Sequence, residues 1–61
     1  MNEEQFTMEL RKFLKRFGVG AQQAIEQAAQ EHSGPKLKVR AVLTIEGAGE
    51  ALVIEEELPT E

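Results

Sequence analysis

The sequence predicts an α+β fold in which two N-terminal helices precede a β-hairpin, an ααββ order that we expect homodimerisation to complete. Three observations predict it: a helical apolar period near the N-terminus, a following stretch rich in alanine and glutamine, and strict apolar alternation after residue 36. We expect a single small domain, 1–61, with helices at about 3–17 and 21–32 and strands at about 36–46 and 50–58.

The first helix is predicted by five large apolar residues whose spacing places them in one stripe about 100° wide. Asn2 is suited to the N-cap, and the negative charges of Glu3 and Glu4 are stabilising near the positive end of the helix dipole. Gly18 stands where a glycine commonly ends a helix. The stripe consists of Phe6, Leu10, Phe13, Leu14 and Phe17.

The second helix is predicted by a stretch of alanine, glutamine and glutamate, all of which favour helices. Its apolar face is built mainly from small residues, which allow another helix to approach closely. Ser33, Gly34 and Pro35 end it, because proline cannot continue a helix. The face consists of Ala21, Ala24, Ile25, Ala28 and His32.

The hairpin is predicted by alternation in the first strand, with apolar residues at Leu37, Val39, Ala41, Leu43 and Ile45. Pairing Ile45 with Glu50 places Leu43 opposite Leu52, Ala41 opposite Ile54 and Leu37 opposite Leu58. The same register sets Arg40 against Glu55 and Lys38 against Glu57. A two-residue loop at Ala48 and Gly49 is the alternative, and Glu56 falls on the apolar side in either case.

The short length of the chain and its lack of cysteine favour self-association. A chain of 61 residues has room for only a thin core, since such chains bury roughly 60% of their unfolded surface. No cysteine is present, which excludes disulfides and most structural zinc sites. A two-stranded sheet is marginal by itself. We therefore expect a homodimer, with an unidentified protein as a further partner.

The charge distribution argues against nucleic acid. The net charge is −4, and the seven basic residues fall in two clusters, at 11–16 and 36–40. The longest apolar run, Ala51 to Ile54, is far shorter than the roughly 20 residues of a membrane span. The acidic N-terminus does not resemble a secretory signal, so we expect a cytoplasmic protein.

The titratable residues give little indication of a catalytic site. His32 has no aspartate or cysteine in the sequence to orient it, so we interpret it as a helix-end residue. Glu55 and Glu57 share a strand face with basic neighbours, which indicates a charge-paired surface. We expect no enzyme, and no catalytic, cofactor-binding or metal-binding residue.

The back of the first helix is the candidate interaction surface. It carries Met8, Arg11, Lys12, Lys15 and Arg16, opposite the apolar stripe. A helix-turn-helix DNA-binding regulator is one alternative, because glycines separate the two expected helices. A small protein associated with a membrane surface is the other, because the helix pairs aromatic and basic faces.

Three segments resemble a family of short bacterial proteins classed as a domain of unknown function. They are Met1 to Phe6, Arg11 to Lys15, and Gly18-Val19 followed by Gln22 to Glu26. The resemblance covers roughly the first thirty residues, and Lys38 to Glu46 more loosely. It implies no activity, cofactor or site. The leading hypothesis is therefore a small, non-catalytic, homodimeric accessory or protein-interaction module.

Overall fold

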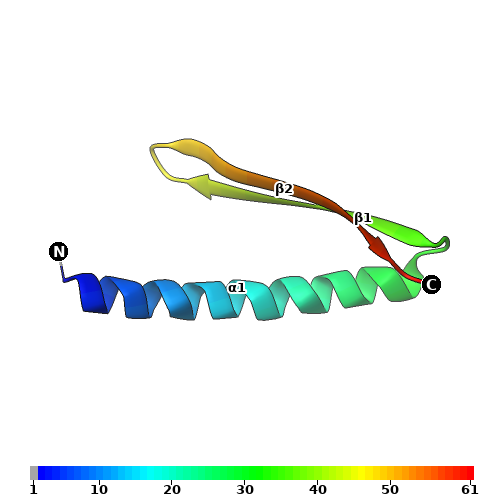
Figure 1. Ribbon diagram of the computed structural model, residues 1–61, viewed down its shortest axis with the longest axis horizontal. Coiled ribbons are helices and arrows are strands. Elements are labelled where there is room, and N and C mark those ends of the chain that lie inside the picture. The colour runs from blue at the N-terminus through cyan, green and yellow to red at the C-terminus, as the bar shows by residue number, and fades with distance from the viewer. Residues whose placement is uncertain (1) are drawn as a thin grey trace. The chain divides into compact units, whose positions relative to one another are not determined.

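The computed structural model describes residues 2–61 and contains one helix followed by an antiparallel β-hairpin (Figure 1). Helix α1 spans Glu3–Glu31, strand β1 spans Lys36–Ile45 and strand β2 spans Gly49–Pro59. The chain divides into two compact units, Met1–Gln30 and Glu31–Glu61. The predicted α+β class and the hairpin are confirmed.

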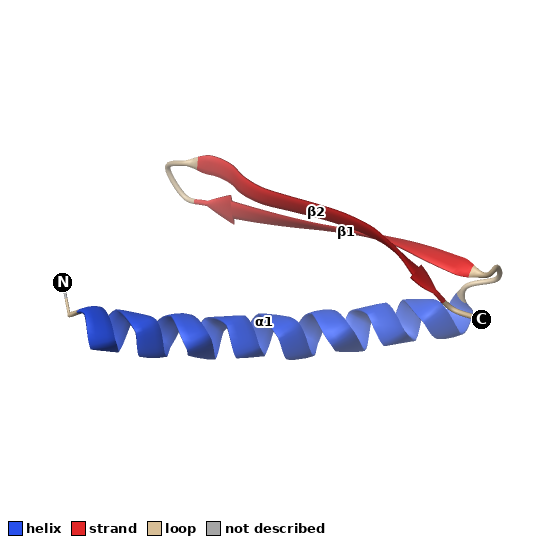
Figure 2. Cartoon of the chain, in the orientation of Figure 1, coloured by secondary structure: helices blue, strands red, loops and turns tan. Residues whose placement is uncertain are grey.

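The prediction of two helices is wrong, because α1 continues for 29 residues without interruption (Figure 2). Neither Gly18 nor Gly20 has a positive φ, so both continue the helix. A break there would expose unpaired backbone groups at two new helix ends. The segment Gly18-Val19-Gly20 offers no serine, threonine, asparagine or aspartate to cap a second helix. Continuing the helix satisfies those groups, although each interior glycine costs about 1 kcal/mol relative to alanine.

The N-terminus of α1 is capped as predicted. The Asn2 side-chain oxygen Oδ1 accepts a hydrogen bond of 3.0 Å from the Gln5 backbone N–H. Glu3 and Glu4 occupy the first turn. The last turn contains no basic residue. The basic cluster at 11–16 would have been near the end of the shorter predicted helix, but it lies in the middle of α1. The helix dipole is therefore complemented at its first end only.

The strand register agrees with the prediction over most of the hairpin. Leu37 pairs with Leu58, Ala41 with Ile54, and Leu43 with Leu52. Lys38 lies opposite Glu57 and Arg40 opposite Glu55, which places opposite charges in neighbouring positions on the second face. The ion pair itself is diagonal, with Lys38 Nζ 3.9 Å from the Glu55 carboxylate.

The end of the hairpin differs from both expected loops. Ile45 pairs with Gly49 rather than Glu50, which leaves a three-residue connection. The Ala48 N–H donates a 2.9 Å hydrogen bond to the Ile45 carbonyl, and Gly47 has a φ of +86° within this turn. Glycine adopts such a conformation without steric cost.

A β-bulge next to this turn shifts the strand pairing by one residue. The pairing shifts between Leu43 and Thr44, so that Thr44 lies opposite Glu50 and Ala51 has no partner. Because paired residues share a face of the sheet, the bulge moves Glu50 from the apolar face to the polar one. The expected pairing of Ile45 with Glu50 is wrong for this reason.

The open end of the hairpin is closed by hydrogen bonds beyond the strands. The Thr60 N–H donates to the Pro35 carbonyl at 2.9 Å, and Thr60 Oγ1 donates to the Gly34 carbonyl at 2.7 Å. His32 Nε2 lies 2.6 Å from the Lys36 carbonyl oxygen, which only accepts, so Nε2 carries the proton. These bonds hold the segment between α1 and β1 against the hairpin.

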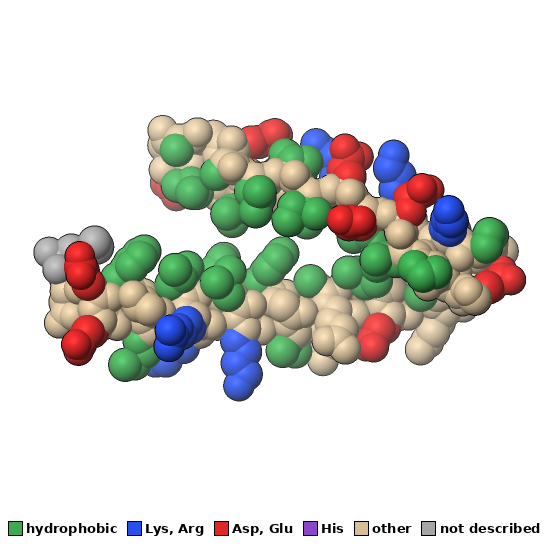
Figure 3. Space-filling view, viewed as in Figure 1, with side chains coloured by type: hydrophobic (Ala, Val, Ile, Leu, Met, Phe, Trp, Pro, Cys, Tyr) green, Lys and Arg blue, Asp and Glu red, His purple; other side chains and the backbone are tan. Residues whose placement is uncertain are grey.

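Among residues 2–61 none is buried. The five stripe residues of α1 have exposed fractions of 41–55%, and Leu43, Leu52 and Ile54 of the hairpin are also exposed. Apolar side chains gather along one side of the helix and one side of the hairpin, and most charged side chains lie elsewhere (Figure 3). The described chain thus presents apolar faces but encloses no core.

Candidate interaction surface

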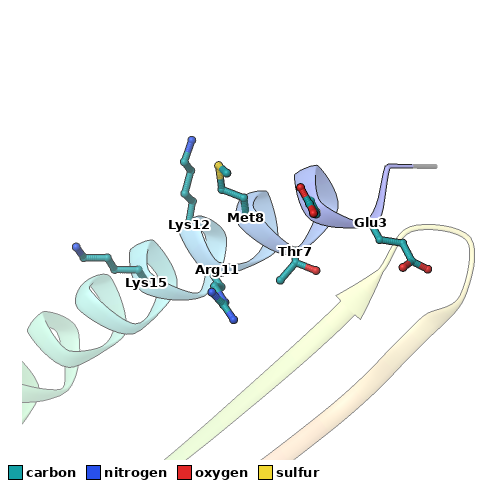
Figure 4. A pocket seen from close by; sticks show the side chains of 7 residues that line it. Glu3, Thr7, Met8, Arg11, Lys12 and Lys15 are labelled. Carbon is teal, nitrogen blue, oxygen red and sulfur yellow. The ribbon is translucent and has the colours of Figure 1, made fainter.

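The basic residues singled out in the sequence all lie on α1, but the structure groups only some of them. Met8, Arg11, Lys12 and Lys15 line one shallow, open depression, and Figure 4 shows Met8 and Lys12 projecting in the same direction. Arg16 lines a different depression together with Phe13 and Phe17. Met8 is 57% exposed, so its thioether is available for contact.

Two carboxylates belong to the same depression, which the sequence interpretation missed. Glu3 and Glu4 line it beside the three cations Arg11, Lys12 and Lys15. Lys12 also lies 3.4 Å from the Glu9 carboxylate one turn earlier. Both partners of that pair are well exposed, so it contributes little to stability. The surface therefore carries both acidic and basic side chains. Residues three or four positions apart lie on the same face of a helix, so the sequence could have shown that the two glutamates lie near the basic residues.

The helix-turn-helix hypothesis required a turn at Gly18. No turn interrupts α1 between Glu3 and Glu31, so that motif is absent from this segment. Within the described residues, α1 also fails to combine the length and apolar character that crossing a membrane requires.

The titratable residues considered in the sequence are dispersed. His32 follows the end of α1 rather than lying within a helix, and its ring is engaged with the Lys36 carbonyl. Glu56 lies opposite Val39, while Glu55 and Glu57 occupy the other face. Over residues 2–61, no three histidine or acidic side chains gather in a way that would hold a metal ion.

A continuous helix creates an apolar seam that two separate helices would not have. Along α1, apolar residues recur at alternating spacings of four and three, the pattern by which helices pack side by side in coiled coils. The spacing was visible in the sequence, but the expected break at Gly18 divided it. We define the α1 seam as Leu10, Leu14, Phe17, Ala21, Ala24 and Ala28.

Two glycines flank the middle of the α1 seam. A Cβ atom placed on Gly18 or Gly20 would meet nothing within 4 Å inside the chain. Contacts within the chain therefore do not explain why glycine, which weakens a helix, occurs at these two positions. Glycines of this kind allow another backbone to approach closely.

A family model described as "Family of unknown function (DUF6494)" matches residues 1–61. The chain belongs to this family. The match spans the hairpin as well as α1, and so extends well beyond the first thirty residues that carried the resemblance. No curated protein and no solved structure matches the chain. The DUF6494 description assigns no activity to the family.

Proposed function

We propose that this DUF6494 protein is a non-catalytic, homodimeric protein-interaction module. The observation that carries the proposal is that no side chain among residues 2–61 is buried, although many of them are large and apolar. Exposed apolar faces of this extent are typical of surfaces that another protein covers. A second copy of the chain is the partner available wherever the protein is made.

The exposed side chains support association. Seven of the large apolar residues that are at least 40% exposed lie on α1, and six lie on the hairpin. Each unit therefore carries apolar surface of the kind that a protein interface covers.

The two units also need added stabilisation. A single helix in water gains little from propensity alone, and most helical stability in proteins comes from packing an apolar face. A hairpin of two strands is marginal without a further strand or a covering helix. Dimerisation stabilises such a chain by mass action, since it favours the folded form over the unfolded one.

The dimer hypothesis is tested by native mass spectrometry and sedimentation equilibrium of untagged protein. We expect a mass of about 13.6 kDa, twice the 6.8 kDa of one chain, and a helical signal that falls on dilution as the dimer dissociates. A folded monomer of 6.8 kDa that persists on dilution would contradict the proposal.

The back of α1 is the proposed contact for a further protein, through Met8 and its basic neighbours. Capture from a bacterial cytoplasmic extract should recover one protein at fixed stoichiometry, and the variant Met8→Ala/Lys12→Ala/Lys15→Ala should lose it. The variant Gln22→Ala/Gln23→Ala is the matched control. Salt-sensitive binding to DNA would instead support a DNA-binding function that does not use a helix-turn-helix, and cosedimentation with anionic vesicles would support association with a membrane surface.

A further inference from the structure

We propose that two copies of the chain pair their α1 helices antiparallel, about a two-fold axis level with Val19. This inference rests on the proposed homodimer and assigns its geometry. It begins from the α1 seam, whose spacings of four, three, four, three and four residues match a coiled-coil repeat. The seam exists only because α1 is continuous.

The α1 seam is symmetric in position about Val19. Counting equally far in both directions from Val19 pairs Leu10 with Ala28, and Phe17 with Ala21. Leu14 pairs with Ala24 by the same rule. In a dimer with two-fold symmetry, residue i of one copy meets residue j of the other, and j meets i in return. The seam therefore fits a second copy of itself running in the opposite direction.

Side-chain size decides between antiparallel and parallel pairing. The half of the seam before Val19 has two leucines and a phenylalanine, and the half after it has three alanines. Parallel helices would place large residues against large ones at one end and alanine against alanine at the other, which would splay the pair. Antiparallel helices place a large residue against an alanine in every layer, so the interaxial distance stays uniform.

The glycines lie at the centre of this arrangement. Gly18 and Gly20 are equidistant from Val19 and flank the seam on its two sides. The space above each of them is open within the chain. At the two-fold axis Gly18 of one copy comes level with Gly20 of the other, where the absence of side chains lets the two backbones approach. Val19 itself lies on the back of the helix and is 50% exposed.

Distances between spin labels test the geometry. The sequence has no cysteine, so one cysteine introduced at a time labels a single site. Four exposed positions on the back of α1 are suitable: Glu4, Lys12, Val19 and Glu26. With a rise of 1.5 Å per residue, like positions in the antiparallel dimer are separated along the axis by about 45, 21, 0 and 21 Å respectively.

We expect measured distances that pass through a minimum at Val19 and are equal at Lys12 and Glu26. Distances that are the same at all four positions would show parallel helices and overturn the inference while leaving the homodimer intact. Distances that change steadily from Glu4 to Glu26 would show a dimer formed elsewhere, and would overturn it likewise. A lack of dipolar coupling together with a monomeric mass would refute the homodimer itself.

Discussion

Glu56 lies directly opposite Val39 in the hairpin, so a carboxylate occupies the otherwise apolar face of the sheet. Its neighbours along β2 on that face are Ile54 and Leu58, which pair with Ala41 and Leu37. This position is the one interruption that the register leaves in the apolar face of β2 between Leu52 and Leu58.

Replacing this carboxylate is expected to stabilise the protein. Glu56→Val creates a β-branched cross-strand pair with Val39, which we expect to raise the free energy of unfolding by about 0.5 kcal/mol. Urea unfolding at fixed protein concentration measures the change. Glu55→Val serves as the control, because it removes the partner of Lys38 on the other face. A loss of more than about 1 kcal/mol for Glu56→Val would show instead that the carboxylate makes a specific contact.

The open end of the hairpin depends on a single hydroxyl. Thr60→Val removes the 2.7 Å hydrogen bond from Oγ1 to the Gly34 carbonyl while keeping the shape of the side chain. We expect a loss of about 1 kcal/mol in the free energy of unfolding, with faster hydrogen exchange at the paired residues Leu37 and Leu58. Thr44→Val, at an exposed site in β1, is the matched control. Equal stability of the two variants would argue against a role for the Thr60 hydroxyl.

The N-cap of α1 gives a third prediction. Asn2→Ala leaves the Gln5 N–H without its side-chain acceptor, and we expect a loss of about 1 kcal/mol. Circular dichroism during thermal unfolding, at one protein concentration, reports the effect. Asn2→Ser keeps a capping oxygen and should unfold close to the wild type. If the serine variant were as unstable as the alanine variant, the loss would have another cause.

Replacing the two interior glycines is expected to stabilise the helix but weaken the dimer. Gly18→Ala/Gly20→Ala should raise the intrinsic helix stability of α1 by about 1 kcal/mol per site. The added methyl groups occupy the space that the second copy needs, so the dimer dissociation constant should rise tenfold or more, which corresponds to about 1.4 kcal/mol. Circular dichroism and sedimentation equilibrium measure the two effects separately.

Val19→Ala is the matched control for the glycine variants. It also replaces a weaker helix former by alanine, but at an exposed site on the back of α1. Its dimer should dissociate at the wild-type concentration. Tighter association of the glycine variants, in step with their helix content, would refute close approach of the two helices at Gly18 and Gly20.

The register was predictable because two independent faces constrain it. Shifting β2 by one residue would have moved Ile54 off the apolar face and Glu55 away from Arg40 together. The bulge was not predictable in the same way. It depends on Gly49, which has a φ of +75°, and on the turn at Gly47, and several loops fit this glycine-rich segment equally well.

The helix break was predicted wrongly because a glycine has the same local appearance at a helix end and inside a helix. The segments on both sides of Gly18 favour helix, and what distinguishes the two cases is the lack of a capping residue before Ala21. Thr60 was missed because its hydroxyl acts on Gly34, 26 positions earlier. No local pattern indicates such a bond.

The unpaired Ala51 changes what the hairpin tolerates. Its side chain is exposed and has no cross-strand partner, so exchanging it for another small residue leaves the pairing intact. Deleting it should also leave the pairing intact, because Glu50 would then directly precede Leu52 and would still lie opposite Thr44, with Ile45 opposite Gly49. Only the bulge and its local bend would be lost. At this point the strand therefore tolerates a change of length as well as a change of residue.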